Sequence, residues 1–229
     1  MIVVLCPTRG RPDQAAEMVR SFRETVHLFA TTLVLVVDRD DPQLDAYLKV
    51  PPQFTEAAGG MPLRPTDPPV VMILEPSETG NLTRATNTAA RRVWDDDCII
   101  GHVGDDHRFR TPGWDVAIEE ALREPGVAYA DDGYWHEALC TSWFVSSSIP
   151  RTLGYLALPT AQHYAIDDVW LQVGRELGRL RYLPDVFIEH PSPKLRVKGP
   201  SKRADREALD VWRRDRMAAE VASVERMIA

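Results

Sequence analysis

Short apolar runs alternate with segments of helical periodicity through the first part of the chain. Ile2–Cys6 and Thr32–Val37 are continuous apolar runs rich in valine, as expected of strands buried on both faces of a parallel sheet. Between them, apolar residues recur at helical spacing from Ala15 to Val26, with Asp13 favourably placed in the first turn. This order predicts the first half of a doubly wound α/β unit, whose ligands bind outside the carboxyl ends of the strands.

The same alternation continues downstream. Val70–Leu74 predicts a strand, a helix begins near Asn81 or Thr83, and Ile99–Val103 predicts a further buried strand. Residues 49–69 are rich in proline and glycine, and they predict a surface excursion with little regular structure.

Beyond Phe109 the pattern is more mixed. It predicts a helix from Trp114, a short strand at Val127–Ala130 and an aromatic hairpin or meander around residues 135–145. A helix carrying Val169 to Leu177 and two short strands, residues 180–182 and 186–188, complete this part.

The composition shifts near the C-terminus, where nine Lys or Arg face four Asp or Glu between Lys194 and Arg216. This predicts a basic loop followed by a charged C-terminal helix. We therefore expect one domain over residues 1–193, with a nucleotide-binding half of about 1–110 and an acceptor half of 111–193. Residues 194–229 form an added arm, and no internal repeat is visible.

Charge and cysteine content narrow the function classes. The 229-residue chain carries a formal net charge of −7, which argues against a protein that coats nucleic acid non-specifically. Cys6, Cys98 and Cys140 match neither a zinc spacing nor a disulfide framework, so a reducing cytoplasm is expected. The apolar start lacks the basic flank of a signal peptide, and no run approaches the roughly 20 apolar residues of a membrane span.

Polar side chains recur where the predicted strands end. The adjacent carboxylates Asp105 and Asp106 follow the strand at Ile99–Val103, and they suit a hard cation such as Mg²⁺ or Mn²⁺. His190, after the last predicted strand, would shift that preference toward Mn²⁺. Arginines of the first loop could neutralise a diphosphate, and Asp167 or Asp168 could take a proton from an attacking hydroxyl. Together these groups suit transfer from a nucleoside diphosphate donor.

Several of these segments resemble one family. Residues 3–12, Val36-Val37-Asp38, Gly80-Asn81 with Asn87, and Gly104-Asp105-Asp106 resemble the nucleotide-binding half of family-2-like glycosyltransferases with the GT-A fold. Residues 165–170 are similar to the Glu-Asp motif in which such enzymes place their base. The pattern of residues 104–115 and of 182–191 looks especially like small bacteriophage-encoded members.

The resemblance implies a role for each matching residue. Asp105 would contact the ribose, Asp106 and His190 would ligate the metal, and Asp168 would be the base of an inverting displacement, with Asp167 its neighbour or substitute. The other implied donor contacts, which would favour a UDP-sugar, are Thr8, Arg9, Arg11, Asp38, Asn81 and Arg84. The sequence departs from the family pattern at two positions. Gly104 replaces the first carboxylate of Asp-x-Asp, and Asp167 stands where Glu is usual.

The acceptor side is less specific. Candidate acceptor contacts are Trp135, His136 and Trp143, although aromatic residues in such a segment are at least as often part of the core. Lys194, Arg196 and Lys198 could form a lid over the diphosphate, or they could form a solvated charged linker. His27, His102 and His163 are assigned no role.

The sequence is compatible with three functions. The first is a metal-dependent glycosyltransferase acting on an unidentified hydroxyl of a virion protein, a modified DNA base or a glycan. The second is a sugar-phosphate nucleotidyltransferase, although Pro7–Pro12 holds only one glycine for a phosphate loop. The third is a catalytically silent module that binds a nucleotide-sugar or a carbohydrate.

Overall fold

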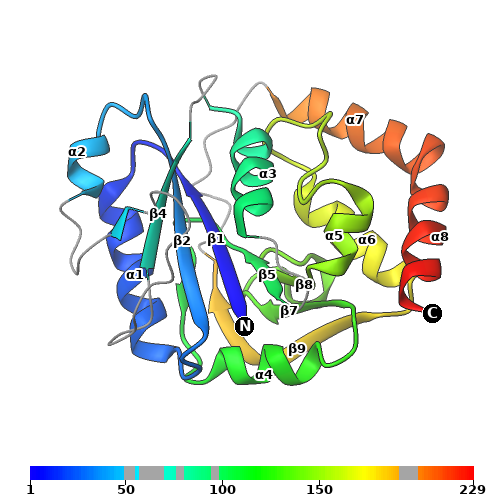
Figure 1. The fold of residues 1–229 in the computed structure, drawn as a ribbon, viewed down its shortest axis with the longest axis horizontal. Coiled ribbons are helices and arrows are strands. Elements are labelled where there is room, and N and C mark those ends of the chain that lie inside the picture. The colour runs from blue at the N-terminus through cyan, green and yellow to red at the C-terminus, as the bar shows by residue number, and fades with distance from the viewer. Residues whose placement is uncertain (49–54, 57–69, 76–79, 94–97, 191–200) are drawn as a thin grey trace.

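A twisted β-sheet runs through the molecule and carries helices on both faces (Figure 1). The computed structural model describes residues 1–48, 55–56, 70–75, 80–93, 98–190 and 201–229. Within these residues the sheet has nine strands in the order β3-β4-β2-β1-β5-β8-β7-β9-β6. The strands are β1 (Ile2–Thr8), β2 (Thr31–Asp38), β3 (Thr55–Glu56), β4 (Val70–Glu75), β5 (Ile99–His102), β6 (Arg108–Phe109), β7 (Val127–Asp131), β8 (Trp143–Ser146) and β9 (Leu180–Glu189).

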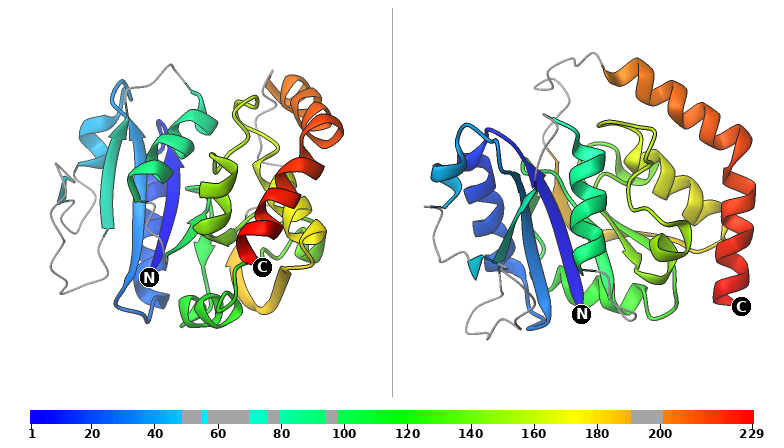
Figure 2. Two further views of the ribbon diagram at one scale, coloured as in Figure 1. Left: turned by 45° about the vertical axis from the view of Figure 1, so that its right-hand side comes forward. Right: turned by 45° about the horizontal axis from the view of Figure 1, so that its top comes forward.

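The helices fill two layers, one on each side of the sheet. They are α1 (Pro12–Thr25), α2 (Leu44–Tyr47), α3 (Leu82–Val93), α4 (Trp114–Ala121), the 3₁₀ turn η1 (His136–Ala138), α5 (Ser148–Leu153), α6 (Ile166–Glu176), α7 (Ser201–Asp215) and α8 (Met217–Ile228). Helices α1 and α4 pack on one face, whereas α3, α5, α6, α7 and α8 contribute to the core on the other. The three-layer arrangement is visible in both views of Figure 2.

The alternation of side chains along β1 explains why both faces are covered. Ile2 and Val4 belong to the core under α1, and Val3 and Leu5 belong to the core under α3. Each strand residue from 2 to 8 is buried, because successive side chains point to opposite, equally apolar layers. The uninterrupted apolar run in the sequence is therefore the signature of a central strand.

Strand direction determines where the polar loops meet. Strands β1, β2, β4 and β5 are mutually parallel, and β7 and β9 run in the same direction as β5. Among the described strands, β6 and β8 run against the rest. The carboxyl ends of β1, β2, β5, β7 and β9 consequently lie along one edge, where an open α/β sheet binds its ligands.

Two local expectations in the second half of the chain were wrong. The two short strands predicted near the end form one strand, β9, whose pairing with β7 shifts register between Leu183 and Phe187. Pro184 and Asp185, which gave the sequence its break, fall in this irregular stretch, where a residue without a backbone N–H is tolerated. The predicted aromatic hairpin or meander is wrong in its first arm, which is the turn η1, whereas its second arm is the strand β8, which pairs antiparallel with both β5 and β7.

The C-terminal region also differs from the prediction of one helix, because α7 and α8 are separate helices that meet at Arg216. Most of the proline- and glycine-rich excursion predicted for residues 49–69 lies outside the described residues. All three cysteines are buried, and none of them forms a disulfide bond. No helix in the described ranges combines the length and apolar character needed to cross a membrane.

Candidate functional site

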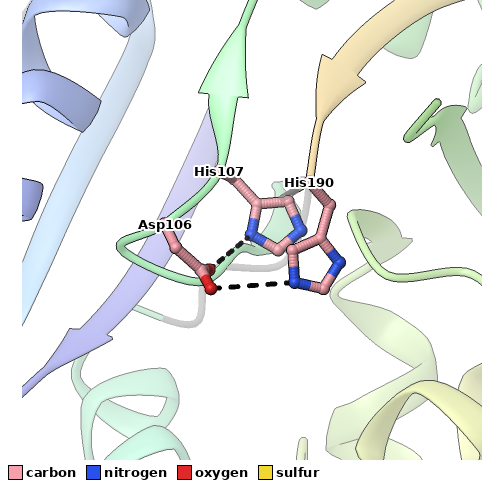
Figure 3. A group of neighbouring side chains, drawn as sticks. All are labelled: Asp106, His107 and His190. Atoms are coloured by element: carbon pink, nitrogen blue, oxygen red, sulfur yellow. Dashed lines mark ion pairs between the residues drawn. The ribbon is translucent and has the colours of Figure 1, made fainter. Parts of the chain in front are cut away.

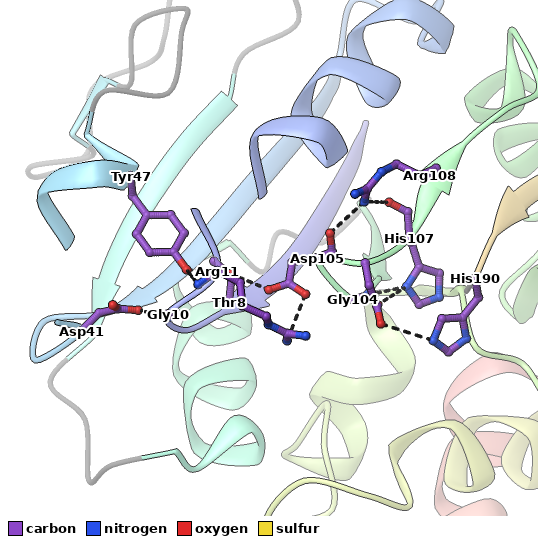
Figure 4. Close-up of polar contacts among 11 residues, drawn as sticks. Thr8, Gly10, Arg11, Asp41, Tyr47, Gly104, Asp105, His107, Arg108 and His190 are labelled. Carbon is purple, nitrogen blue, oxygen red and sulfur yellow. Dashed lines mark hydrogen bonds and ion pairs between the residues drawn. The ribbon is translucent and has the colours of Figure 1, made fainter. Parts of the chain in front are cut away.

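The parallel strands bring five of the candidate residues into two adjoining groups at one edge of the sheet. Thr8 and Arg11 both contact Asp105 (Figure 4), and Asp106 lies beside His190 (Figure 3). Residues far apart in the sequence thus converge, as the positions of the strand ends predicted. The two groups are joined by the peptide bond between Asp105 and Asp106.

The first group is a buried hydrogen-bond chain around Asp105. Thr8 Oγ1 donates to Asp105 Oδ2 at 2.6 Å, and Arg11 Nη2 lies 2.9 Å from Asp105 Oδ1. Because Thr8 gives its proton to Asp105, the hydroxyl of Tyr47, 3.0 Å away, donates to Thr8 and accepts the backbone N–H of Arg11 at 2.8 Å. Asp105 is fully buried, and its Oδ2 accepts the hydrogen bond from Thr8, whereas its Oδ1 forms the ion pair with Arg11 and accepts no hydrogen bond among the described residues. Asp105 therefore holds Arg11, whose side chain is 48% exposed.

Asp38 and its neighbours fix the loop after β1. Arg9 Nη1 donates to Asp38 Oδ2 at 2.8 Å and to Asp40 Oδ1 at 2.7 Å. Asp41 accepts the backbone N–H of Gly10 at 2.7 Å and that of Gln43 at the same distance. The loop carrying Arg9 and Arg11 is consequently tied to the loop after β2 by both side-chain and backbone bonds.

The second group is a carboxylate between two imidazoles. Asp106 Oδ1 lies 3.4 Å from His107 Nδ1, and Asp106 Oδ2 lies 3.8 Å from His190 Nε2 (Figure 3). One ligand atom from each of the three residues lies within 4.8 Å of the other two. His107 Nε2 is buried and finds no hydrogen-bond partner among the described residues. One oxygen and two nitrogen donors at this spacing fit a divalent transition metal such as Mn²⁺.

The two carboxylates have opposite electrostatics. Burial raises the pKa of Asp105, and the neighbouring Arg11 and Thr8 only partly offset this effect. Burial also disfavours ionisation of Asp106, but His107, His190 and Arg11 outweigh it and lower the pKa of that carboxyl. Asp106 is therefore ionised at neutral pH, which is the form a metal ligand must have.

Gly104 has a steric reason to replace the first carboxylate of an Asp-x-Asp motif. A Cβ at this position would lie 2.6 Å from Asp106 Oδ1 and 3.0 Å from His107 Nδ1. The Gly104 backbone N–H also donates to His107 Nδ1 at 3.0 Å. Both side chains fold over residue 104, so a larger residue there would displace the Asp106 carboxylate from its present position.

His190 is anchored by the end of β7. Its backbone N–H donates to the carbonyl oxygen of Asp132 at 3.0 Å, and its Nδ1 lies 4.0 Å from Asp132 Oδ2. The other oxygen of Asp132 accepts three successive backbone N–H groups, from Tyr134, Trp135 and His136. The same buried carboxylate thus organises the loop that presents Trp135, which is 37% exposed.

Asp167 and Asp168 stand in the first turn of α6. Asp167 Oδ1 accepts the indole N–H of Trp143 at 3.3 Å. Asp168 is 45% exposed, and its Oδ1 lies 3.9 Å from Arg213 Nη2 on α7. The two candidate bases that the sequence left open are both partly buried, and they differ in their partners, because Asp167 is bonded to the buried Trp143 and Asp168 faces Arg213.

The remaining candidates have structural surroundings of their own. Asn81 caps α3, because its Oδ1 accepts the backbone N–H of Arg84 at 2.8 Å. Trp143 is fully buried between His102 and Trp170, which places it in the core and not on a surface that an acceptor could reach. Lys194, Arg196 and Lys198 lie outside the described residues.

Sequence reasoning gave no role to His107, Tyr47 or Asp132. His107 directly follows Asp105-Asp106, so the Asp-Asp-His triplet carried a local signal for a ligand. Asp132 also follows a strand in the sequence and could have been found by that rule. Tyr47 gave no such signal, because its contact with Thr8 and Arg11 depends on how α2 returns to the sheet edge.

Comparison with known proteins bears on the fold. Neither a known protein family nor a curated protein matches the sequence. Among solved structures, the chain is similar to the mannosyltransferase PcManGT from Pyrobaculum calidifontis in complex with GDP-Man and Mn²⁺. That pair has a TM-score of 0.61 at 11% identity, over 97% of this chain and 72% of the other.

Two further structures share the arrangement. S. aureus TarS 1–349 in complex with UDP-GlcNAc has a TM-score of 0.59 at 13% identity, covering 96% of this chain and 66% of the other. A Bacillus anthracis protein assigned as a glucose-1-phosphate thymidylyltransferase has a TM-score of 0.52 at 11% identity, covering 92% and 96%. Identities this low establish the fold alone, and that fold is the mixed α/β fold of GT-A glycosyltransferases.

Proposed function

We propose that this chain is a metal-dependent glycosyltransferase that moves a sugar from a nucleoside diphosphate sugar to a hydroxyl acceptor. The observation that carries the proposal is the pairing of a candidate cation centre, Asp106 with His107 and His190, with a rigidly held, exposed Arg11 on the adjoining loop. A cation and a guanidinium side by side match the charge of a diphosphate. The GDP-Man of the mannosyltransferase and the UDP-GlcNAc of TarS belong to this donor class.

Asp106 and His190 would hold the cation, with His107 as a third candidate ligand. A bound Mn²⁺ would supply the positive charge that stabilises the diphosphate as it leaves. The chain contributes the geometry, because Gly104 keeps Asp106 and His107 together and Asp132 fixes the backbone of His190. A carboxylate and imidazoles together favour Mn²⁺ over Mg²⁺.

The nucleotide would lie along the loop after β1. Arg11 would contact the diphosphate, and Asp105 would act by orienting Arg11, because its own oxygens are occupied by Arg11 and Thr8. Asp38, with Arg9 bonded to it, would face the nucleoside. This assignment revises the direct ribose contact that the family resemblance implies for Asp105.

The acceptor would approach from the side of α6 and η1. Asp168, whose side chain is 45% exposed, would take the proton of the attacking hydroxyl and so favour inversion at the anomeric carbon. Asp167 would stay bonded to Trp143 and would orient the turn. Trp135 and His136 remain candidate acceptor contacts, because Asp132 holds both at the same sheet edge.

The test is a thermal-shift panel of UDP-, GDP-, dTDP- and CMP-sugars, each measured with and without Mn²⁺. We expect one donor class to raise the melting temperature, and only when Mn²⁺ is present, because ligands that bind the folded state stabilise it. Release of nucleoside diphosphate from that donor then tests catalysis. Binding without release by the wild-type chain would favour a silent binding module.

A sugar-phosphate nucleotidyltransferase is the second candidate, because the thymidylyltransferase-like protein shares the fold over 92% of this chain. The two reactions differ in their products. A nucleotidyltransferase would join a sugar 1-phosphate to a nucleoside triphosphate and release pyrophosphate. A glycosyltransferase would transfer the sugar to an acceptor and release a nucleoside diphosphate.

A further inference from the structure

Helix α7 contacts the loop before α6, the helix that carries the candidate base Asp168. Asp205 on α7 is only 1% exposed, and its carboxylate accepts three consecutive backbone N–H groups. Oδ1 accepts from Gln162 at 2.7 Å, and Oδ2 accepts from His163 at 3.0 Å and from Tyr164 at 2.8 Å. A single buried side chain of α7 thus satisfies three amides of the loop that leads into α6.

That loop fixes where α6 begins. Ala165, the next residue, has φ of +76°, a left-handed conformation that side-chain-bearing residues rarely adopt. Helix α6 starts at Ile166, so Asp167 and Asp168 lie within four residues of the nearest amide that Asp205 holds. The bonds from Asp205 therefore stabilise a strained turn directly before the two aspartates.

A second contact from the same helix reaches the candidate base itself. Arg213 Nη2 lies 3.9 Å from Asp168 Oδ1, and Arg213 Nε donates to Gln172 Oε1 at 2.7 Å. Asp205 and Arg213 lie about two helical turns apart on α7, and both face α6 or the loop before it. Helix α7 thus contacts the loop before α6 through Asp205 and α6 itself through Arg213.

We infer that Asp205 and Arg213 are positioning residues, through which α7 sets the place and orientation of Asp168. This inference rests on the proposed function, in which Asp168 takes the proton of the acceptor. It also gives the C-terminal segment a role in catalysis, where the sequence predicted only an added arm.

The test compares Asp205→Asn with Glu220→Gln. Glu220 is a suitable control, because its carboxylate accepts from Tyr155 and Trp212, away from the loop before α6. In Asp205→Asn an amide NH₂ replaces one carboxylate oxygen and faces N–H donors, so at least one backbone amide loses its acceptor. We expect faster amide hydrogen exchange at residues 162–168 in Asp205→Asn, and unchanged exchange there in Glu220→Gln.

Measurements of kcat and KM distinguish the misplacement of Asp168 from a general loss of folded protein. With the donor whose Mn²⁺-dependent hydrolysis the wild-type chain catalyses, we expect Asp205→Asn to lower kcat by about 10- to 100-fold, because small misplacements of a catalytic group have effects of this size. We expect its KM for the donor to stay within about twofold, since the nucleotide-binding loops are untouched. Arg213→Gln should show a smaller change of the same kind.

Distinct results would overturn each part. Unchanged exchange at residues 162–168 in Asp205→Asn would refute the positioning of α6. Equal losses of kcat in Asp205→Asn and Glu220→Gln, at equal melting temperatures, would reduce Asp205 to a general stabilising residue. A wild-type chain without donor hydrolysis or transfer would instead refute the proposed function, and the exchange experiment would still decide whether Asp205 fixes the turn.

Discussion

His107 and His190 stack face to face, with ring centroids 4.2 Å apart and ring planes 14° from parallel. The two residues come from different parts of the chain, one from the loop after β5 and the other from the end of β9. The stack brings a ring nitrogen of each histidine and a carboxylate oxygen of Asp106 within 4.8 Å of one another, so a cation at the edge of the rings would have nitrogen and oxygen donors nearby. The stack therefore joins the candidate ligands after β5, Asp106 and His107, to the candidate ligand after β9, His190.

Replacing His190 by alanine should weaken Mn²⁺ binding by at least about 10-fold, since ligands and the groups that orient them contribute on this scale. Titration calorimetry with MnCl₂ and the identified nucleotide measures the effect. His163→Ala, which removes an exposed imidazole, is the matched control. Equal Mn²⁺ affinity in both variants would exclude His190 from the centre.

Gly104→Ala should impair the metal centre with little effect on the rest of the fold. The added Cβ meets Asp106 Oδ1 at 2.6 Å, so the carboxylate must move. We expect loss of Mn²⁺-dependent stabilisation by the nucleotide in a thermal-shift experiment. Gly178→Ala is the control for backbone strain, because its φ is +62° and a Cβ there meets nothing within 4 Å. If Gly104→Ala binds Mn²⁺ like the wild type, the steric account of Gly104 is wrong.

Arg11→Gln should weaken donor binding by about 10-fold, the equivalent of one charge-assisted hydrogen bond to a diphosphate. The affinity that remains should also depend less on salt, because a charge contact has been removed. Arg123→Gln, at an exposed arginine paired with Glu120, provides the control for net charge. A donor affinity equal to that of Arg123→Gln would remove Arg11 from the diphosphate site.

Asp168→Asn should retain donor binding and lose transfer by about 10²- to 10⁴-fold, the usual contribution of a general base. Asp167→Asn should have the smaller effect, because Asp167 is already bonded to Trp143. Calorimetry for the nucleotide and initial rates for transfer measure the two quantities separately. Full activity in Asp168→Asn would move the base to Asp167 or to another group.

His102 should make the protein sensitive to acid. Burial, together with the nearby charges of His107 and His163, lowers the pKa of His102 to about 3. The unfolded chain binds a proton there near pH 6.5, so below that pH the unfolded state holds more protons than the folded state. The contribution of His102 to the free energy of unfolding is therefore complete above about pH 6.5. It is lost as the pH falls toward 3, by up to about 1.4 kcal/mol per pH unit.

The measurement is urea denaturation of wild type and His102→Phe between about pH 4 and pH 7. Phenylalanine keeps an aromatic ring against Trp143, on which His102 stacks at 5.1 Å, but it cannot take up a proton. We expect a flatter pH dependence in His102→Phe and an unchanged one in His27→Gln, which removes an exposed imidazole that is not among the groups acting on His102. Parallel curves for wild type and His102→Phe would show that His102 contributes nothing to acid sensitivity.

Most strands of the parallel sheet could be predicted, because a strand buried on both faces is a continuous apolar run. The rule that ligands gather at the carboxyl ends of parallel strands then predicts that Asp105, Asp106 and His190 share one edge of the sheet. Strand β9 could not be predicted, since Pro184 interrupts the run and only its pairing with β7 shows that the strand continues.

The less predictable part of the site depends on tertiary contacts. Asp105 was expected to meet the ribose, but whether a carboxylate faces a ligand or a neighbouring arginine depends on loop geometry that spacing does not encode. Asp205 is one acid in a charged helix, and its burial depends on a loop at residues 162–164, far earlier in the chain. Local patterns identify strands and charges, whereas partners across the fold require the structure.

Strand β5 pairs with β1 on one side and with β8 on the other, so the N-terminal and C-terminal halves of the domain share a single continuous hydrogen-bonded sheet. A hinge that closed one half over the other would have to break one of these ladders. Any closure around a substrate must therefore come from the loops at the sheet edge, while the sheet itself stays fixed. Changes in loop sequence could then alter donor or acceptor preference without disturbing the distance between the two halves.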